Sequence, residues 1–231
     1  MADSMTDTLV LAHGAFHGPW CWHRTSLWLE QRGVRCVGVD LNRGGLEPDR
    51  VALQAVVNEL VHDGSRVHAI GHSLGCASVA ALDPNSLATA MFLAGPVAGG
   101  GMPDPADCIF PQFIKKLLPQ DDGRAFMSRE DARHAFYHAC EPALAEWALD
   151  RLRPTFVYGA GAPESDADGT PLPIWETIPV TYIACLQDRA VRPDFQALAS
   201  QICPHSATLD SDHSPMLGQP EALGAPVLHG R

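Results

Sequence analysis

Short apolar runs alternate along the chain with segments whose apolar residues recur at helical spacing. The runs that predict buried strands are residues 8–12, 35–40, 66–70, 88–93, 179–185 and 206–210. The segments that predict helices are residues 19–32, 49–62, 74–82, 192–201 and 215–222. Strands that alternate with helices are typical of a mostly parallel sheet covered on both faces, so we expect an α/β fold.

The alternation stops between the fourth and fifth predicted strands. Helix-like patterns follow one another there without an intervening strand, at residues 111–118, 129–139 and 142–152. We interpret the stretch from about residue 96 to about residue 178 as a helical cap (lid) inserted into a single domain that spans residues 1–231. Near the C-terminus, Gly224 and Pro226 interrupt the last helical pattern, so we expect a short and broken closing helix.

A serine follows the third predicted strand at the point where a helix is predicted to begin. Ser73 is the centre of the sequence Gly-His-Ser-Leu-Gly at residues 71–75. A sharp strand-to-helix turn strains the backbone of such a serine and pushes its hydroxyl out of the sheet, and small residues two positions away give the turn room. A glycine-rich loop is the alternative for this sequence. The strand before it and the helix after it favour a catalytic nucleophile.

A nucleophilic serine requires a base and a carboxylate that orients the base. In proteins with this kind of turn, the acid and then the histidine follow the serine along the chain, each on a loop after a later strand. Asp188 follows the predicted strand 179–185, and His213 follows the predicted strand 206–210. We therefore predict that Ser73, Asp188 and His213 form a catalytic triad.

Other residues compete for the roles of base and acid. His205 precedes its strand and is expected at the end of the sheet away from the site, because catalytic groups gather at the carboxyl ends of the strands. Asp210 and Asp212 flank His213, but side chains so close in sequence rarely point at the ring nitrogen. An aspartate at position 188 is also typical of an ordinary turn, and that is the alternative to a catalytic role. Its place after a strand and before His213 favours the catalytic role.

Attack on a carbonyl group also requires two N–H donors for the oxygen that becomes negative. One donor belongs to the residue after the nucleophile, which is Leu74. The second is expected in residues 13–18, the loop after the first strand, and we assign it to the N–H of Ala15. Gly14 lets the backbone approach a substrate closely, and the His13 side chain is expected to support this loop.

Together these motifs resemble the α/β-hydrolases, and in particular the branch of plant methyl-ester hydrolases, hydroxynitrile lyases and their bacterial relatives. The segments that carry the resemblance are residues 13–22, 71–75, 135–140, 187–189 and 212–215. The resemblance implies an α/β-hydrolase fold, ester hydrolysis without a cofactor, and a mobile helical cap. The lyases of this branch have threonine after the loop histidine and lysine after the catalytic histidine. Here Gly14 and Ser214 occupy those positions, which favours acyl transfer.

The predicted substrate is a carboxylic ester of a small apolar or aromatic molecule. Phe16, next to Ala15 in the loop of residues 13–18 (the oxyanion loop), is the predicted pocket wall. Other functions stay open on the same residues. The chain could be a hydroxynitrile lyase or carbon–carbon bond hydrolase, a biosynthetic acyl transferase or cyclase, or a ligand-binding protein with a slow triad.

Composition describes the setting of this chemistry. The 231 residues carry a formal charge of −11 without a basic cluster, which argues against nucleic acid and membrane partners. We recognise no secretory signal and no apolar run long enough to span a membrane. Seven cysteines without short paired spacing argue against a disulfide framework or a metal site of the zinc type. We expect a cytoplasmic protein whose partner is a small-molecule substrate, and a homodimer is left open.

Overall fold

The computed structural model describes residues 6–97, 101–102, 104, 107–157 and 173–230, and its centre is a parallel sheet of six strands. The strands are β1 (Asp7–Ala12), β2 (Arg35–Val39), β3 (Arg66–His72), β4 (Thr89–Leu93), β7 (Val180–Cys185) and β8 (His205–Leu209). Their order across the sheet is β2-β1-β3-β4-β7-β8. The inner strands are buried on both faces, which explains why they are almost continuously apolar in sequence. The predicted sheet is confirmed.

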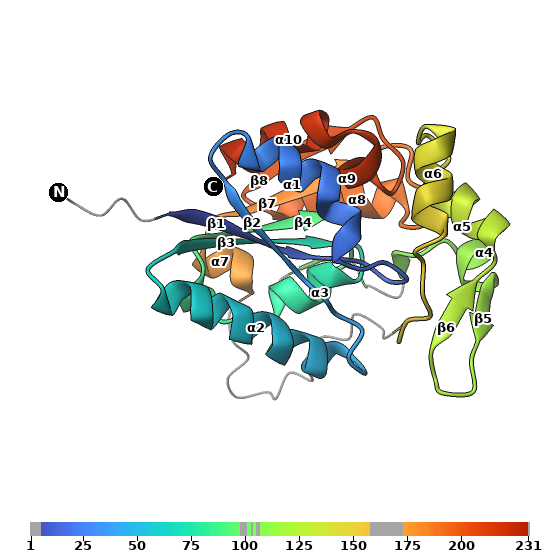
Figure 1. Cartoon of the computed structure of the whole chain (residues 1–231), viewed down its shortest axis with the longest axis horizontal. Helices are drawn as coiled ribbons and strands as arrows, with labels where there is room; N and C mark the ends of the chain where they lie inside the picture. The colour runs from blue at the N-terminus through green and yellow to red at the C-terminus, as the bar shows by residue number, and fades with distance from the viewer. Residues whose placement is uncertain (1–5, 98–100, 103, 105–106, 158–172, 231) are drawn as a thin grey trace.

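Helices cover both faces of this sheet (Figure 1). One face carries η1 (Pro19–Trp22), α1 (His23–Glu30), α9 (Pro215–Gly218) and α10 (Pro220–His229). The other carries α2 (Leu46–His62), α3 (Gly75–Ala80), α7 (Ile174–Thr177) and α8 (Pro193–Ile202), and the short η2 (Pro84–Ser86) precedes β4. Each face has its own hydrophobic cluster, as the α/β pattern predicts. Leu29 and Leu223 belong to the first, and Leu53 and Phe195 to the second.

Between β4 and β7 the described chain forms a separate group of elements. They are α4 (Pro111–Ile114), β5 (Leu117–Pro119), β6 (Ala125–Met127), α5 (Arg129–Phe136) and α6 (Pro142–Leu149). We call residues 107–157 the β4–β7 segment. Figure 1 shows its elements gathered beyond the carboxyl ends of the strands, which is where the sequence places the candidate site.

The prediction of one helix over residues 111–118 is wrong. The helix ends at Ile114, and β5 pairs with β6 in an antiparallel hairpin. Gly123, in the turn of this hairpin, has a φ of +82°, a left-handed conformation that glycine adopts readily. The helices predicted over 129–139 and 142–152 are present as the shorter α5 and α6. Residues 98–100, 103, 105–106 and 158–172 of the predicted cap lie outside the described residues.

The expectation of a short and broken C-terminal helix is also wrong. α10 continues through Gly224 and Pro226 to His229. A Cβ atom at position 224 would lie 2.3 Å from two ring carbons of Trp28, so glycine is the residue that lets α10 approach α1 this closely. The glycine that weakens the helix in isolation therefore permits the contact that holds it in the fold.

None of the helices in the described part of the chain combines the length and the apolar content that crossing a bilayer would require.

Candidate active site

Ser73 lies in a sharp turn between β3 and α3. Its φ is +50°, a left-handed conformation that is rare for residues with a side chain and typical of strained functional positions. Added Cβ atoms at the flanking glycines would collide with backbone: at Gly71 with the carbonyl of Gly75 at 2.5 Å, and at Gly75 with the carbonyl of His13 at 2.6 Å. The turn therefore has the geometry of a nucleophile elbow, and both glycines are sterically required.

Asp188 and His213 come together from the loops after β7 and β8. A hydrogen bond of 2.7 Å joins His213 Nδ1 to Asp188 Oδ2, and both side chains are buried. Because a carboxylate only accepts, Nδ1 carries the proton and Nε2 is left to act as a base. The structure thus brings together the two residues that the sequence predicts as acid and base.

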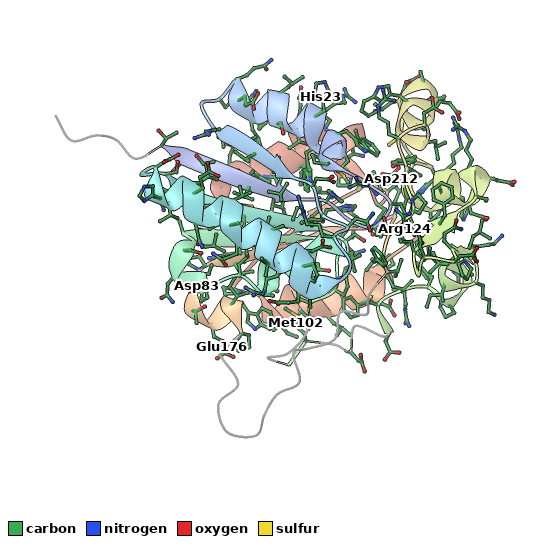
Figure 2. The ribbon with its side chains drawn as sticks, turned by 60° about the horizontal axis from the view of Figure 1, so that its bottom comes forward. His23, Asp83, Met102, Arg124, Glu176 and Asp212 are labelled. Atoms are coloured by element: carbon green, nitrogen blue, oxygen red, sulfur yellow. The ribbon has the colours of Figure 1, made fainter. Side chains whose placement is uncertain are left out.

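The rival residues point elsewhere. His205 begins β8 at the opposite end of the strand and is exposed. Asp210 Oδ1 accepts a hydrogen bond from Gln187 Nε2. Asp212 accepts from the Ala139 N–H at 2.9 Å, and Figure 2 shows Asp212 where the sheet meets the β4–β7 segment. This arrangement favours Asp188 over both neighbouring aspartates as the partner of the histidine.

A hydrogen bond joins the loop that carries His213 (the histidine loop) directly to the elbow. His72, the residue before Ser73, donates from Nε2 to the carbonyl of His213 at 2.8 Å, and the two imidazole rings lie 4.6 Å apart between centroids. Among the described residues no hydrogen bond joins the Ser73 hydroxyl to His213. Apo sites often hold this bond too long and tighten it when substrate binds.

A residue that the sequence analysis missed fixes the acid. Gln196 of α8 is fully buried, and its Nε2 donates to Asp188 Oδ2 at 2.9 Å and to the Val191 carbonyl at 3.0 Å. Its Oε1 accepts from the Cys185 N–H at 2.8 Å. The other carboxylate oxygen of Asp188 accepts two backbone N–H bonds, from Ala190 and Val191. The amide placed eight residues after the acid gave no recognisable pattern in the sequence.

The predicted oxyanion donors lie on the two sides of Ser73. An added Cβ at Gly14 would be 2.8 Å from Ser73 Cβ, so the loop after β1 runs directly against the elbow. Neither the Ala15 N–H nor the Leu74 N–H has an acceptor among the residues that the structure describes, whereas the Phe16 N–H donates to Thr155 Oγ1. His13 supports the loop as expected, since it accepts from the Leu41 N–H and donates to the Gly14 carbonyl.

Aromatic side chains surround the imidazole of His213. Phe136 of α5 lies 5.6 Å from that ring and 6.1 Å from Phe16, measured between centroids. Phe113, whose ring lies 5.7 Å from that of Phe136, lines a cavity of about 490 Å³ between α4, α5 and Arg189. A cavity of this volume is in the range that small organic ligands occupy, and charged side chains such as Lys116 and Arg189 lie among its walls.

The buried histidines beside the site are neutral. Burial lowers the pKa of His17 to about 3, and burial together with the nearby His213 holds the pKa of His72 well below its ordinary value. A neutral ring can donate from one nitrogen only, so each of these histidines keeps a fixed hydrogen-bonding direction.

Metal-binding residue types do not gather in the described residues: no group of three or more histidine, cysteine, aspartate or glutamate side chains there could hold an ion.

Comparison with known proteins adds a family and named relatives. The model of the alpha/beta hydrolase family matches residues 9–225. Methylesterase 18 of Arabidopsis thaliana is 25% identical over 261 residues, which cover 93% of this chain and 93% of that protein. Norfluorocurarine synthase 2 of Strychnos sp is 26% identical over 252 residues, or 93% of this chain and 91% of that protein. The crystal structure of a methylesterase from Arabidopsis has a TM-score of 0.75 and 24% identity, and the match covers 96% of this chain and 97% of that one.

Proposed function

Because this chain belongs to the alpha/beta hydrolase family, we propose that it hydrolyses carboxylic esters with Ser73, His213 and Asp188 as its triad. The single observation that carries the proposal is the 2.7 Å hydrogen bond between His213 and Asp188 beside a serine strained into an elbow. The similarity to Methylesterase 18 supports the reaction class. We further propose that residues 1–231 form a single domain with a cap inserted at about residues 96–178, to which the β4–β7 segment belongs.

The reaction begins when an ester carbonyl lies against the elbow. His213 Nε2 takes the proton of Ser73 as Oγ attacks, and the negative oxygen of the tetrahedral intermediate accepts from the N–H groups of Ala15 and Leu74. His213 then gives its proton to the leaving alcohol, and an acyl-enzyme remains. Water, deprotonated by the same ring, cleaves the acyl-enzyme and restores Ser73.

The surroundings of Asp188 suit this cycle. Its carboxylate accepts hydrogen bonds from two backbone N–H groups and from Gln196, and these bonds hold it in one orientation. It faces the imidazole of His213 in a water-excluded site, where a fixed negative charge stabilises the imidazolium that forms after proton transfer.

The substrate proposed for this site is a small, apolar or aromatic ester. Phe136 presents ring surface to His213 and lies 6.1 Å from Phe16, and Phe113, 5.7 Å from Phe136, lines a cavity. Ring surfaces of this kind favour apolar or aromatic groups of a ligand.

The seven cysteines are free thiols, and six of them are buried. Free thiols are the usual state in a reducing compartment, and this supports the cytoplasm as the proposed location.

The test of the proposed function is hydrolysis of a panel of methyl esters and p-nitrophenyl esters by the wild-type chain and by Ser73→Ala. The serine acts through its oxygen, so the variant is expected to lose at least about 1,000-fold in kcat while its unfolding curve stays unchanged. Ser206→Ala, on an exposed serine of β8, is the control and is expected to retain activity. Ester turnover that survives Ser73→Ala would remove the serine from its proposed role.

A second function is carried by the similarity to norfluorocurarine synthase 2, because that relative is named for a synthesis rather than a hydrolysis. On the same triad, a nucleophile other than water could take the acyl group, or a lyase step could replace hydrolysis. Mass spectrometry of the products in the presence of alcohol and amine acceptors separates these outcomes from hydrolysis. Tight ligand binding without turnover would instead indicate a binding protein.

A further inference from the structure

The end of the β4–β7 segment is hydrogen-bonded to the loop that carries Ala15. The Arg153 N–H donates to the Phe16 carbonyl at 3.0 Å, and the Phe16 N–H donates to Thr155 Oγ1 at 2.8 Å. Arg153 Nε also donates to the His17 carbonyl at 3.0 Å. Successive peptide groups of this loop are therefore hydrogen-bonded to residues more than 130 positions away in sequence.

A second connection comes from Tyr137, the residue that follows α5. A hydrogen bond of 2.7 Å joins its hydroxyl to His17 Nε2, and another of 2.7 Å joins His17 Nδ1 to the Ala15 carbonyl. Because a carbonyl only accepts, the ring proton is on Nδ1, and Tyr137 is the donor to Nε2. The two hydrogen bonds therefore run in one direction, with Tyr137 donating to His17 and His17 donating to Ala15.

These bonds account for nearly every peptide group of the loop. The Gly14 carbonyl accepts from His13 Nδ1 at 2.9 Å, the Ala15 carbonyl from His17, and both groups of Phe16 are bonded to the β4–β7 segment. The His17 N–H turns back to the Gly14 carbonyl at 3.4 Å. Of the N–H groups of residues 15, 16 and 17, only that of Ala15 lacks an acceptor among the described residues.

We infer that Thr155 is a positioning residue of the oxyanion hole. Its hydroxyl accepts a hydrogen bond from the Phe16 N–H, and this bond leaves the Ala15 N–H as the donor that faces the substrate. The inference rests on the proposed function. Phe16 has a φ of +66°, a conformation unfavourable for a bulky residue, so the loop does not hold this shape through its own preferences. The bonds from Thr155, Arg153 and, through His17, Tyr137 maintain it.

The variants Thr155→Val and Thr155→Ser separate the hydroxyl from the rest of the side chain. Valine keeps the volume and removes the acceptor, so the Phe16 peptide loses its bond and the Ala15 N–H loses its direction. We expect kcat to fall about 10-fold to 100-fold with KM changed by less than about 3-fold, because an oxyanion donor acts in the transition state. Serine keeps the oxygen and is expected to restore kcat to within about 3-fold of wild type.

Two further measurements distinguish positioning from a general loss of structure. A trifluoromethyl ketone, which forms a tetrahedral adduct with the serine, should bind Thr155→Val more weakly by the same factor as kcat falls. Amide hydrogen exchange at Phe16 should become faster in that variant. Thr8→Val is the matched control, because Thr8 is a buried threonine with a hydroxyl hydrogen bond at the other end of β1. It should leave kcat and ketone binding unchanged.

The outcomes separate this inference from the function on which it rests. If the wild-type chain hydrolyses esters and Thr155→Val does so with wild-type kcat, the positioning role is overturned and the function stands. A kcat that falls equally in Thr155→Ser, or in Thr8→Val, also overturns it, because the hydroxyl would then not be the cause. If the wild-type chain neither hydrolyses esters nor reacts at Ser73 with a fluorophosphonate, the proposed function is wrong and this inference fails with it.

Discussion

Gln196 holds the carboxylate of Asp188 with a neutral amide, and the neutrality of that group is important. The amide donates to Asp188 Oδ2 while its oxygen accepts from the Cys185 N–H, so both ends of the side chain are used in a fully buried position. The acid therefore faces His213 while its Oδ2 accepts from a neutral amide that adds no charge of its own.

Gln196→Glu keeps the shape of this side chain and places a carboxylate oxygen against Asp188 Oδ2. Two buried like charges at this distance cannot both ionise without a large cost, so we expect the free energy of unfolding at pH 7 to fall by about 2–4 kcal/mol. Ester hydrolysis should fall with it, because a proton shared by the two carboxylates weakens the interaction with His213. Urea unfolding and kcat/KM at pH 7 measure the two effects.

Gln187→Glu is the matched control for this change. Gln187 also donates from Nε2 to an aspartate, Asp210, but the pair is exposed and water screens its charges. A surface charge of this kind should alter stability by less than about 1 kcal/mol. Equal losses in the two variants would show that burial around Asp188 is not what makes the amide necessary.

At this scale the sequence predicts residues whose chemistry is local and leaves out those whose partners are distant. Ser73 was recognisable because its flanking glycines and strand are adjacent to it, and Asp188 and His213 because each follows a strand. Gln196 and Thr155 are ordinary residues in the sequence. Their importance arises from contacts with Asp188 and Phe16, which only the folded chain brings within reach.

Among the elements, α10 shows that a packing contact can reverse a preference read from sequence. Gly224 and Pro226 weaken an isolated helix, but at Gly224 the backbone of α10 packs directly against the ring of Trp28 in α1. Tertiary burial of Leu223 and Val227 in the same cluster supplies the stabilisation that local propensity lacks.

Gly224→Ala tests this contact. Alanine favours helix locally by about 1 kcal/mol, yet its Cβ would lie 2.3 Å from the Trp28 ring, so either the ring or the helix must move. We expect the variant to be destabilised by about 1–3 kcal/mol in urea unfolding. Adding Trp28→Leu should recover part of that loss, because the smaller side chain makes room for the methyl group. Stabilisation by Gly224→Ala alone would contradict the packing argument.

The strands and the helices between them were predictable because each buries one face or both and so has a regular apolar period. The β5–β6 hairpin was not, although Asp122 and Gly123 form a dipeptide typical of hairpin turns. Its strands have three residues each, too few for a period of two to appear in sequence, and the helical spacing of Phe113, Ile114 and Leu117 masked them.

For the whole molecule, burial of neutral histidines makes the stability of the fold depend on pH. His72 is the last residue of β3 and bonds the His213 carbonyl, and His17 lies in the loop after β1 and bonds Tyr137. Burial is the first cause of the lowered pKa of each. In the unfolded chain both titrate near the ordinary value of 6.5. The arrangement that holds the oxyanion loop and the histidine loop therefore exists only while these rings are uncharged.

The direction of the effect follows from which state binds protons. Between about pH 6.5 and the folded value of about 3 for His17, the unfolded chain takes up a proton that the folded chain refuses, so the free energy of unfolding falls as pH falls. Each of the two histidines adds a slope that approaches about 1.4 kcal/mol per pH unit. Urea unfolding at intervals from pH 7.5 to 5 should show little change in the free energy of unfolding above pH 7 and a progressive loss below it.

In His17→Gln the amide still reaches the Ala15 carbonyl but does not titrate, so the change of the free energy of unfolding with pH near pH 5 should be shallower by about 1 kcal/mol per unit. A slope that is the same in both proteins would mean that His17 is protonated in the folded chain, and the fixed direction from Tyr137 to Ala15 would then be lost.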